Sequence, residues 1–253
     1  MVCDKRYIIR LDTVDSTNRY LRDEADILWN KCALEKRFVV VVAGHQTAGR
    51  GQRGNKWCSN AGENLLFSVL LRPGEMLKVG KQFLLSQAVA LSLHHTMKRY
   101  GIETRLKWPN DIYVGNRKLA GILVEVDYSG TFVEQAIIGI GINVNQELFP
   151  EMDRIPVSMK MLLGRNLGIN DVLNTALEFF EHYYSQMLYG NREALAAEYS
   201  RLLLGYKEQR SFVDSEARFD AVIEGVEGDG HLLLRRKDGT LSRYAFKEVE
   251  QLL

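Results

Sequence analysis

Positions 49–54 read GRGQRG and combine two arginines with three glycines. Guanidinium groups and exposed backbone N–H groups both suit an anion such as a phosphate. The spacing also matches the G-x-G-x-x-G pattern of dinucleotide-binding proteins, in which a strand leads into the glycines and a helix follows at once. Here residues 44–47 separate an apolar strand at 38–43 from the glycines, and residues 55–64 lack helical spacing of apolar side chains. The sequence therefore predicts a flexible cationic loop, whose alternative is a solvated surface loop.

The stretch KWPND at 107–111 places a cation, an indole and two polar side chains around a proline. Pro109 excludes a helix and keeps Trp108 extended. A turn alone would not need the flanking Lys107 and Trp108. Asn110 and Asp111 are also common turn formers, so a simple hairpin entrance explains them equally well.

Two further stretches place small residues within apolar strands. In RKLAGIL, residues 117–123, Lys118 stands just before Gly121, and a small residue in a strand lets a ligand approach the backbone. In GIGINVN, residues 139–145, Gly139 and Gly141 alternate and so point to one face. The alternatives are an ordinary exposed lysine and close packing of a neighbouring element on the glycines.

The stretch DSTN at 15–18 offers good helix N-cap residues. Free N–H groups and hydroxyls at a helix start can also hold a carboxylate. Taken alone, capping is the commoner use of Ser16 and Thr17.

The hydrophobic pattern predicts an α+β protein. We expect a helix after DSTN and strands and helices at the following positions: strands at 7–11, 38–43, 65–71, 104–108 and 132–144, a hairpin of 112–114 with 119–126, and helices at 83–100, 171–188 and 192–204. Short strands with Asp-Gly turns follow from residue 205. We therefore predict a catalytic domain at 1–204 and a small β-domain at 205–253.

Composition narrows the function classes. The chain has 253 residues, 46% of them hydrophobic, enough for one large core and a small second domain. A net charge of +1 without a long basic run gives nucleic-acid binding no electrostatic support. Cys3, Cys32 and Cys58 are scattered, which fits a reducing cytoplasm and predicts no disulfide framework and no metal site. No apolar run suits a signal peptide or a membrane span, and we expect His94 and His95 to be ordinary helix residues.

In this order, DSTN, GRGQRG with the following KW, KWPND, RKLAGIL and GIGIN resemble the biotin protein ligase family over residues 8–145. The pair KWPND and RKLAGIL is very specific, and the other motifs support it. The resemblance implies a mixed β-sheet flanked by helices, of the biotin/lipoyl ligase type, with a small C-terminal β-barrel of the Src-homology-3 type.

The resemblance also implies an activity. Such enzymes activate biotin with ATP and Mg²⁺ to biotinyl-5′-AMP and pass the biotinyl group to a lysine of a biotin carboxyl carrier domain, here that of acetyl-CoA carboxylase or a related biotin-dependent carboxylase. It makes Lys118, Arg50 and Asp111 catalytic and leaves open whether Asp111 positions Mg²⁺ or takes the proton of the incoming lysine. The implied binding residues are Ser16, Thr17, Asn18 and Gln46 around biotin, Arg50, Gly51 and Gln52 in a loop that closes over the adenylate, and Trp57, Lys107, Asn110, Lys118, Gly121, Gly139, Gly141 and Asn143 elsewhere in the site.

Two departures from the family pattern carry expectations. The family loop usually reads Gly-Arg-Gly-Arg, but Gln52 replaces its second arginine, and we expect Arg53 to take part of that role. No helix-turn-helix module precedes Tyr7, so we expect a ligase that binds no operator DNA. The sequence leaves monomer and homodimer open.

Two rival functions remain at this stage. A lipoate- or octanoate-type protein ligase or transferase shares the fold, although it is not expected to combine KWPND with RKLAGIL. A non-catalytic biotin or adenylate sensor needs no reacting lysine, so Lys118 argues against it.

Overall fold

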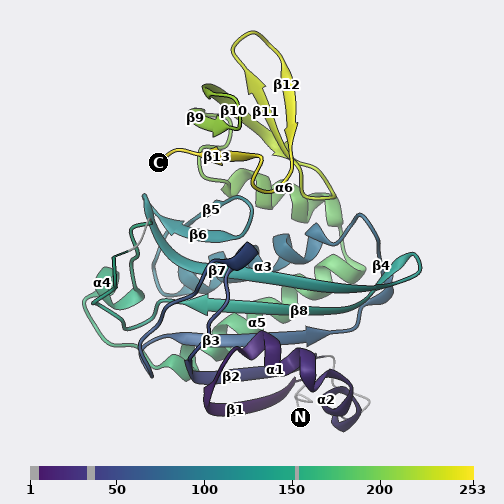
Figure 1. Cartoon of the computed structure of the whole chain (residues 1–253), viewed down its shortest axis with the longest axis vertical. Coiled ribbons are helices and arrows are strands. Elements are labelled where there is room, and N and C mark those ends of the chain that lie inside the picture. The colour runs from purple at the N-terminus through teal and green to yellow at the C-terminus, as the bar shows by residue number, and fades with distance from the viewer. Residues whose placement is uncertain (1–5, 33–37, 152–153) are drawn as a thin grey trace. The chain divides into compact units, whose positions relative to one another are not determined.

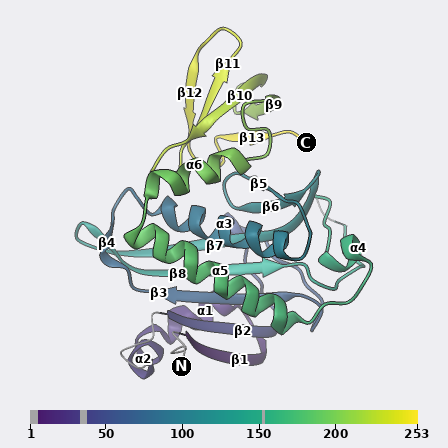
Figure 2. The ribbon, with the colours of Figure 1, turned by 180° about the vertical axis from the view of Figure 1, so that it is seen from behind.

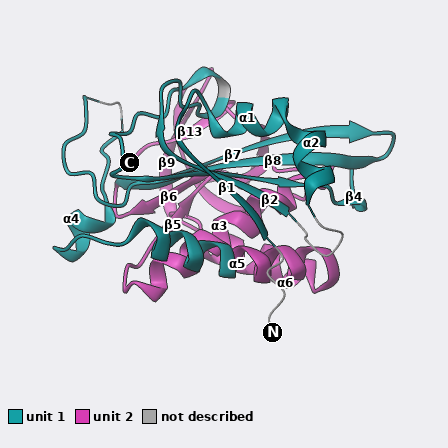
Figure 3. Ribbon diagram, turned by 90° about the horizontal axis from the view of Figure 1, so that it is seen from below, with its two compact units in different colours: residues 1–79, 117–178 teal, residues 80–116, 179–253 magenta. Residues whose placement is uncertain are grey.

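A computed structural model of the chain describes residues 6–32, 38–151 and 154–253, with the main chain alone at Arg53 (Figure 1). Cys3 lies outside these residues. The chain divides into two compact units, coloured separately in Figure 3. Unit 1 contains Met1–Val79 and Arg117–Glu178, and unit 2 contains Gly80–Asn116 and Phe179–Leu253. Each unit is described by itself, and the domain boundary at 204/205 stays a prediction.

Unit 1 is built on a mixed sheet whose strands run in the order β1-β2-β3-β8-β7, with β4 also paired to β8 (Figure 1). Strands β1 and β2 are parallel, and the other neighbouring pairs are antiparallel. The mixed sheet predicted from the sequence is thus confirmed. The strands are β1 (Arg6–Val14), β2 (Phe38–Gln46), β3 (Leu65–Leu71), β4 (Gly74–Lys78), β7 (Arg117–Ser129) and β8 (Phe132–Ile142).

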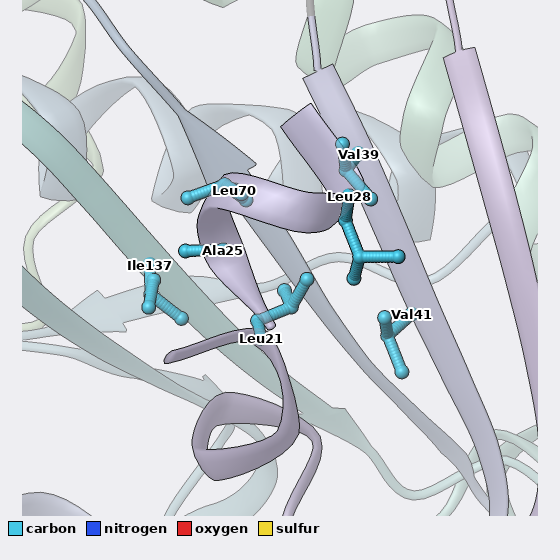
Figure 4. Close-up of a cluster of buried hydrophobic side chains, with 7 residues drawn as sticks. All are labelled: Leu21, Ala25, Leu28, Val39, Val41, Leu70 and Ile137. Carbon is cyan, nitrogen blue, oxygen red and sulfur yellow. The ribbon is translucent and has the colours of Figure 1, made fainter. Parts of the chain in front are cut away.

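Continuous apolar runs place β2 and β3 in the middle of this sheet. Every residue of β3 is buried, which is the pattern of a strand covered on both faces. Helices α1 (Thr17–Asp23) and α2 (Ala25–Lys31) cover one face. Figure 4 shows their buried contact, formed by Leu21, Ala25, Leu28, Val39, Val41, Leu70 and Ile137.

Three elements of unit 1 differ from the prediction. The single helix expected after DSTN is two helices, because Glu24 leaves the helical conformation at φ −107° and ψ 8°. Strand β4 and helix α4 (Met159–Leu163) were not predicted, since both are only five residues long. Ser158 caps α4, and Gly164 ends it at a positive φ of 68°, a conformation that favours glycine.

Unit 2 contains helices α3 (Phe83–Arg99) and α6 (Arg192–Leu202), which pack together (Figure 2), and the hairpin of β5 (Arg105–Lys107) with β6 (Asp111–Val114). Helix α5 (Ile169–Tyr189) contributes residues to both units. On α3, His94 Nδ1 lies 2.8 Å from Thr104 Oγ1, and His95 Nε2 lies 2.8 Å from Glu198 Oε1. Burial, aided by the charge of His95, lowers the pKa of His94 to about 4, so His94 is neutral near pH 7.

A five-stranded antiparallel sheet ends the chain, in the order β12-β11-β10-β9-β13. It confirms the short strands predicted from residue 205, whereas a separate domain and closure into a barrel stay predictions. Two of its turns fall at the Asp-Gly pairs, where Gly230 and Gly239 have φ of 102° and 87°. Its strands are β9 (Gln209–Asp214), β10 (Arg218–Val226), β11 (Leu232–Arg236), β12 (Leu241–Tyr244) and β13 (Val249–Gln251).

The described helices include none that is both long and apolar enough to cross a membrane. Residues 55–64, all of them described, also form no helix after the GRGQRG loop. The dinucleotide-binding interpretation of that loop is therefore excluded by its structural context.

Candidate active site

Three glycines open one face of the sheet in unit 1. Gly139 and Gly141 alternate along β8, and Gly121 of β7 pairs with Gly141. A Cβ added at Gly139 would lie 2.3 Å from Asn18 Oδ1, and one at Gly141 would lie 2.4 Å from the Trp57 ring. The glycines are thus required here because side chains from other segments lie directly on the sheet.

The DSTN stretch is tied to Gln46 rather than used for capping. Ser16, at the N-cap of α1, makes no side-chain capping bond. The backbone N and the Oγ1 of Thr17 both donate to Gln46 Oε1, at 2.7 and 3.0 Å. Ser16, Thr17 and Asn18 are each only 3% exposed, so this polar group is buried against the sheet.

Ser68 is the buried centre of that polar group. Its Oγ lies 2.6 Å from both Thr17 Oγ1 and Asn18 Oδ1, and the side chain is fully buried in the middle of β3. Strand β3 pairs Ser68 with Gly139, which brings the hydroxyl to the glycine-opened face. Asn18 Nδ2 in turn donates to Glu125 Oε2 of β7 at 2.8 Å.

Sequence reasoning missed Ser68 and Glu125. The available signal was a lone hydroxyl inside the apolar run LLFSVLL. A buried hydroxyl needs a hydrogen-bond partner, so its position could have been singled out. Glu125 gave no comparable signal, because its importance depends on which segments face β7.

The GRGQRG loop forms a short closed excursion. Gly51 N donates to Asn55 O at 2.7 Å, and Trp57 N donates to Gly49 O at 3.0 Å. Gln52 lies in the single 3₁₀ turn η1 (Gln52–Gly54), while the side chain of Arg53 lies outside the described residues. Residues 45–51 and 54–59 line a cavity of about 500 Å³. The loop therefore surrounds a space large enough for a small ligand.

Lys118 reaches the same face of unit 1. Its Nζ lies 5.6 Å from the centre of the Trp57 ring, and a Cβ at Gly121 would lie 3.3 Å from that Nζ. Its backbone is fixed by bonds to Ile155 O at 2.8 Å and from Val157 N at 2.9 Å. The ammonium group is thus held beside the glycines and the indole.

Asn143 is 4% exposed and donates its side-chain amide to main-chain carbonyls, at 3.2 Å to Val157 O and 3.4 Å to Lys118 O. In this structure Asn143 therefore supports the backbone of Lys118. Its predicted contact with a ligand stays a prediction.

The KWPND residues lie in unit 2. Lys107 and Asp111 are opposite each other in the β5–β6 hairpin and are 5% and 4% exposed. Asn110 is partly buried between them in the turn. Trp108 Nε1 donates to Gly230 O at 3.0 Å, and its ring lies 5.3 Å from that of Phe246. Trp108 is partly buried and packs against two connections of the C-terminal sheet.

A cluster of possible metal ligands also lies in unit 2. Suitable atoms of Glu227, Asp229 and His231 all lie within 4.8 Å of one another, and sequence reasoning did not single them out. Arg243 pairs with both carboxylates, so a protein cation already offsets part of their charge.

Comparison with known proteins identifies the family. The profile of the biotin/lipoate A/B protein ligase family matches residues 11–143, which include the glycine-opened face, the loop and Lys118. This chain belongs to the biotin/lipoate A/B protein ligase family. The resemblance inferred from the motifs is thereby confirmed.

Members of the biotin/lipoate A/B protein ligase family match most of the chain. It is 31% identical over 243 residues to the bifunctional ligase/repressor BirA of Bacillus spizizenii, covering 95% of this chain and 73% of that protein. It is 32% identical over 212 residues to the biotin–[acetyl-CoA-carboxylase] ligase of Paracoccus denitrificans, covering 79% and 85%. The biotin protein ligase of Aquifex aeolicus in complex with biotin and ATP has a TM-score of 0.78 at 26% identity, covering 97% and 98%.

Proposed function

We propose that this chain activates biotin with MgATP and transfers the biotinyl group to a lysine of a biotin carboxyl carrier domain of acetyl-CoA carboxylase or a related biotin-dependent carboxylase. The observation that carries the proposal is the placement of Lys118 beside the glycines. The hydrogen-bonded network of Thr17, Asn18, Gln46 and Ser68 lies on the same face of unit 1. Biotin has one end that needs such polar partners, its ureido group, and one end that reacts, its carboxylate.

In the first step a carboxylate oxygen of biotin bonds to the α-phosphorus of ATP, and the bond to the pyrophosphate oxygen breaks. Both reactants are anionic, so a fixed cation lowers the barrier by offsetting their repulsion. Lys118 has this role in the proposal, and Arg50 brings a second cation from the loop. Mg²⁺ enters with ATP as part of the substrate.

In the second step the lysine amine of the carrier attacks the acyl carbon, AMP leaves and the amine loses a proton. An acyl adenylate is destroyed by water, which is why a loop that covers it is expected. The glycine-rich loop suits that task because its glycines permit rearrangement of the backbone.

Asp111 is the carboxylate assigned to this chemistry in unit 2. It is buried opposite Lys107, and one carboxylate with substrate phosphates is a usual environment for Mg²⁺. Positioning Mg²⁺ and accepting the proton are both roles open to the carboxylate of Asp111. We also infer a cytoplasmic location, supported by the free cysteines Cys32 and Cys58.

Exchange of labelled pyrophosphate into ATP tests the first step. The protein is expected to catalyse exchange with biotin and not with lipoate or octanoate. Exchange with lipoate or octanoate in place of biotin would assign the chain to the rival activity. Binding of biotin without any exchange would make it a sensor.

A further inference from the structure

Glu125 lies where the buried polar group meets the glycine-rich loop. On β7 it follows Gly121 by four residues, so strand alternation puts both on one face. Its Oε2 accepts the hydrogen bond from Asn18 Nδ2 at 2.8 Å, while its Oε1 lies 3.3 Å from Arg50 Nη2. The side chain is 19% exposed, so this carboxylate requires a cation.

A second arginine, Arg22, lies near the same oxygen of Glu125. Arg22 Nη2 lies 3.8 Å from Glu125 Oε1, and Arg22 Nη1 lies 3.3 Å from Asp127 Oδ1. Asp127 also accepts from Gln135 at 3.2 Å, which fixes its carboxylate. If Arg50 left, Arg22 would therefore remain as the counterion of Glu125.

The ion pair between Glu125 and Arg50 is weak enough for another anion to replace Glu125. Arg50 is 49% exposed and meets Glu125 through one nitrogen, the geometry of a weak surface ion pair. A guanidinium has five donors, and a phosphate can engage two of them at once. A phosphate reaching the loop would thus compete well with the carboxylate.

We propose that Glu125 is a positioning residue for the glycine-rich loop. It holds Arg50 in the ligand-free protein, beside Asn18, and yields it to the ligand's phosphate while Arg22 compensates its charge. This inference rests on the proposed function, because the phosphate in question is that of biotinyl-5′-AMP. The contact between Glu125 and Arg50 therefore sets the position of the loop in the ligand-free protein, before the loop closes over the ligand.

Amide hydrogen exchange of residues 49–56, followed by mass spectrometry, tests the ligand-free part. Glu125→Gln keeps an oxygen for Asn18 and removes the charge. It is expected to raise exchange of this segment about two- to fivefold, the range of a surface ion pair. Asp127→Asn is the matched control, because Asp127 lies on the same strand as Glu125 but contacts Arg22 and not Arg50. This variant is expected to leave the hydrogen exchange of residues 49–56 unchanged.

A β-ketophosphonate analogue of biotinyl-5′-AMP keeps the negative charge at phosphorus. Its binding tests whether Arg50 leaves Glu125 for the phosphate of the ligand. Glu125→Gln is expected to bind it two- to fivefold more tightly, with the bound loop as protected as in the wild type. Arg22→Gln is expected to bind it more weakly, because release of Arg50 then leaves Glu125 without a cation. This loss of affinity should disappear when Arg22→Gln is combined with Glu125→Gln, because no buried charge then lacks a cation.

Unchanged exchange in ligand-free Glu125→Gln would overturn the proposal. So would weaker analogue binding by Glu125→Gln, because Glu125 would then act in the closed loop. Failure of the analogue to protect the wild-type loop would instead contradict the proposed function. The ligand-free comparison is independent of that outcome and still decides whether Glu125 holds Arg50.

Discussion

Replacing Gly139 by alanine tests whether the glycine-opened face is the biotin site. The new Cβ would lie 2.3 Å from Asn18 Oδ1 and 3.0 Å from its Cγ. Ordinary contact begins near 3.4 Å, so the amide must move by about 1 Å. Such a shift breaks the bonds of Asn18 to Ser68 at 2.6 Å and to Glu125 at 2.8 Å.

The magnitude follows from those two hydrogen bonds. A neutral hydrogen bond contributes about 1 kcal/mol and one to a charged group about 2 kcal/mol. These bonds hold Asn18 in the position assigned to binding, so their joint loss of about 3 kcal/mol sets an upper limit of roughly 100-fold on the weakening of biotin binding. Because Asn18 is assigned to binding biotin and not to the reacting carboxyl group, we expect the KM for biotin to rise while kcat changes little.

The assay is pyrophosphate exchange as a function of biotin concentration, with the melting temperature measured in parallel. Gly225→Ala is the control, since a Cβ at Gly225 would meet nothing within 4 Å. An unchanged KM in Gly139→Ala, with the fold intact, would refute the assignment of Asn18. A fall in kcat alone would move Asn18 from binding to the reaction itself.

Three further predictions follow from the site and its surroundings. Lys118→Ala should slow adenylate formation by about 3 kcal/mol of barrier without loss of the fold, and near-normal exchange would remove Lys118 from the chemistry. In hydroxylamine trapping without carrier, Arg53→Ala should release more biotinyl-5′-AMP than the wild type and Gln52→Arg no more. If Arg53→Ala releases no more than the wild type while Gln52→Arg markedly slows release, Arg53 does not replace the family arginine. Because the folded pKa of His94 is about 4 against 6.5 unfolded, the free energy of unfolding should fall by about 3 kcal/mol as pH drops from 6.5 through 4. Denaturation of His94→Gln should show a shallower fall, and equal slopes would exclude His94 as the cause.

The apolar runs carried most of the fold prediction. The strand predicted at 65–71 agrees with β3, because its apolar run is continuous. The helix predicted from residue 83 agrees with α3, because apolar residues recur at helical spacing over many turns. Short elements such as β4 and α4 lack that signal. The break at Glu24 was also missed, because apolar spacing continues across it.

The site was predictable where a motif is local and not where it depends on pairing. DSTN, GRGQRG and RKLAGIL could be recognised as stretches of sequence. Ser68 and Glu125 gain their roles only because β3 and β7 both flank β8, which brings residues 50 and 107 positions apart into contact. The lone hydroxyl in LLFSVLL marks Ser68 as a buried polar residue, but its partners and the role of Glu125 have no local signal, because non-local register is set by the folded sheet.

Transfer to a carrier domain tests the central claim most directly. The protein is incubated with biotin, MgATP and a biotin carboxyl carrier domain, and the intact mass of that domain is measured. We predict the addition of a single biotinyl group, absent when the target lysine of the carrier is replaced by arginine. A carrier that gains a lipoyl or octanoyl group instead, or no group at all while biotin and ATP are bound, would contradict the account.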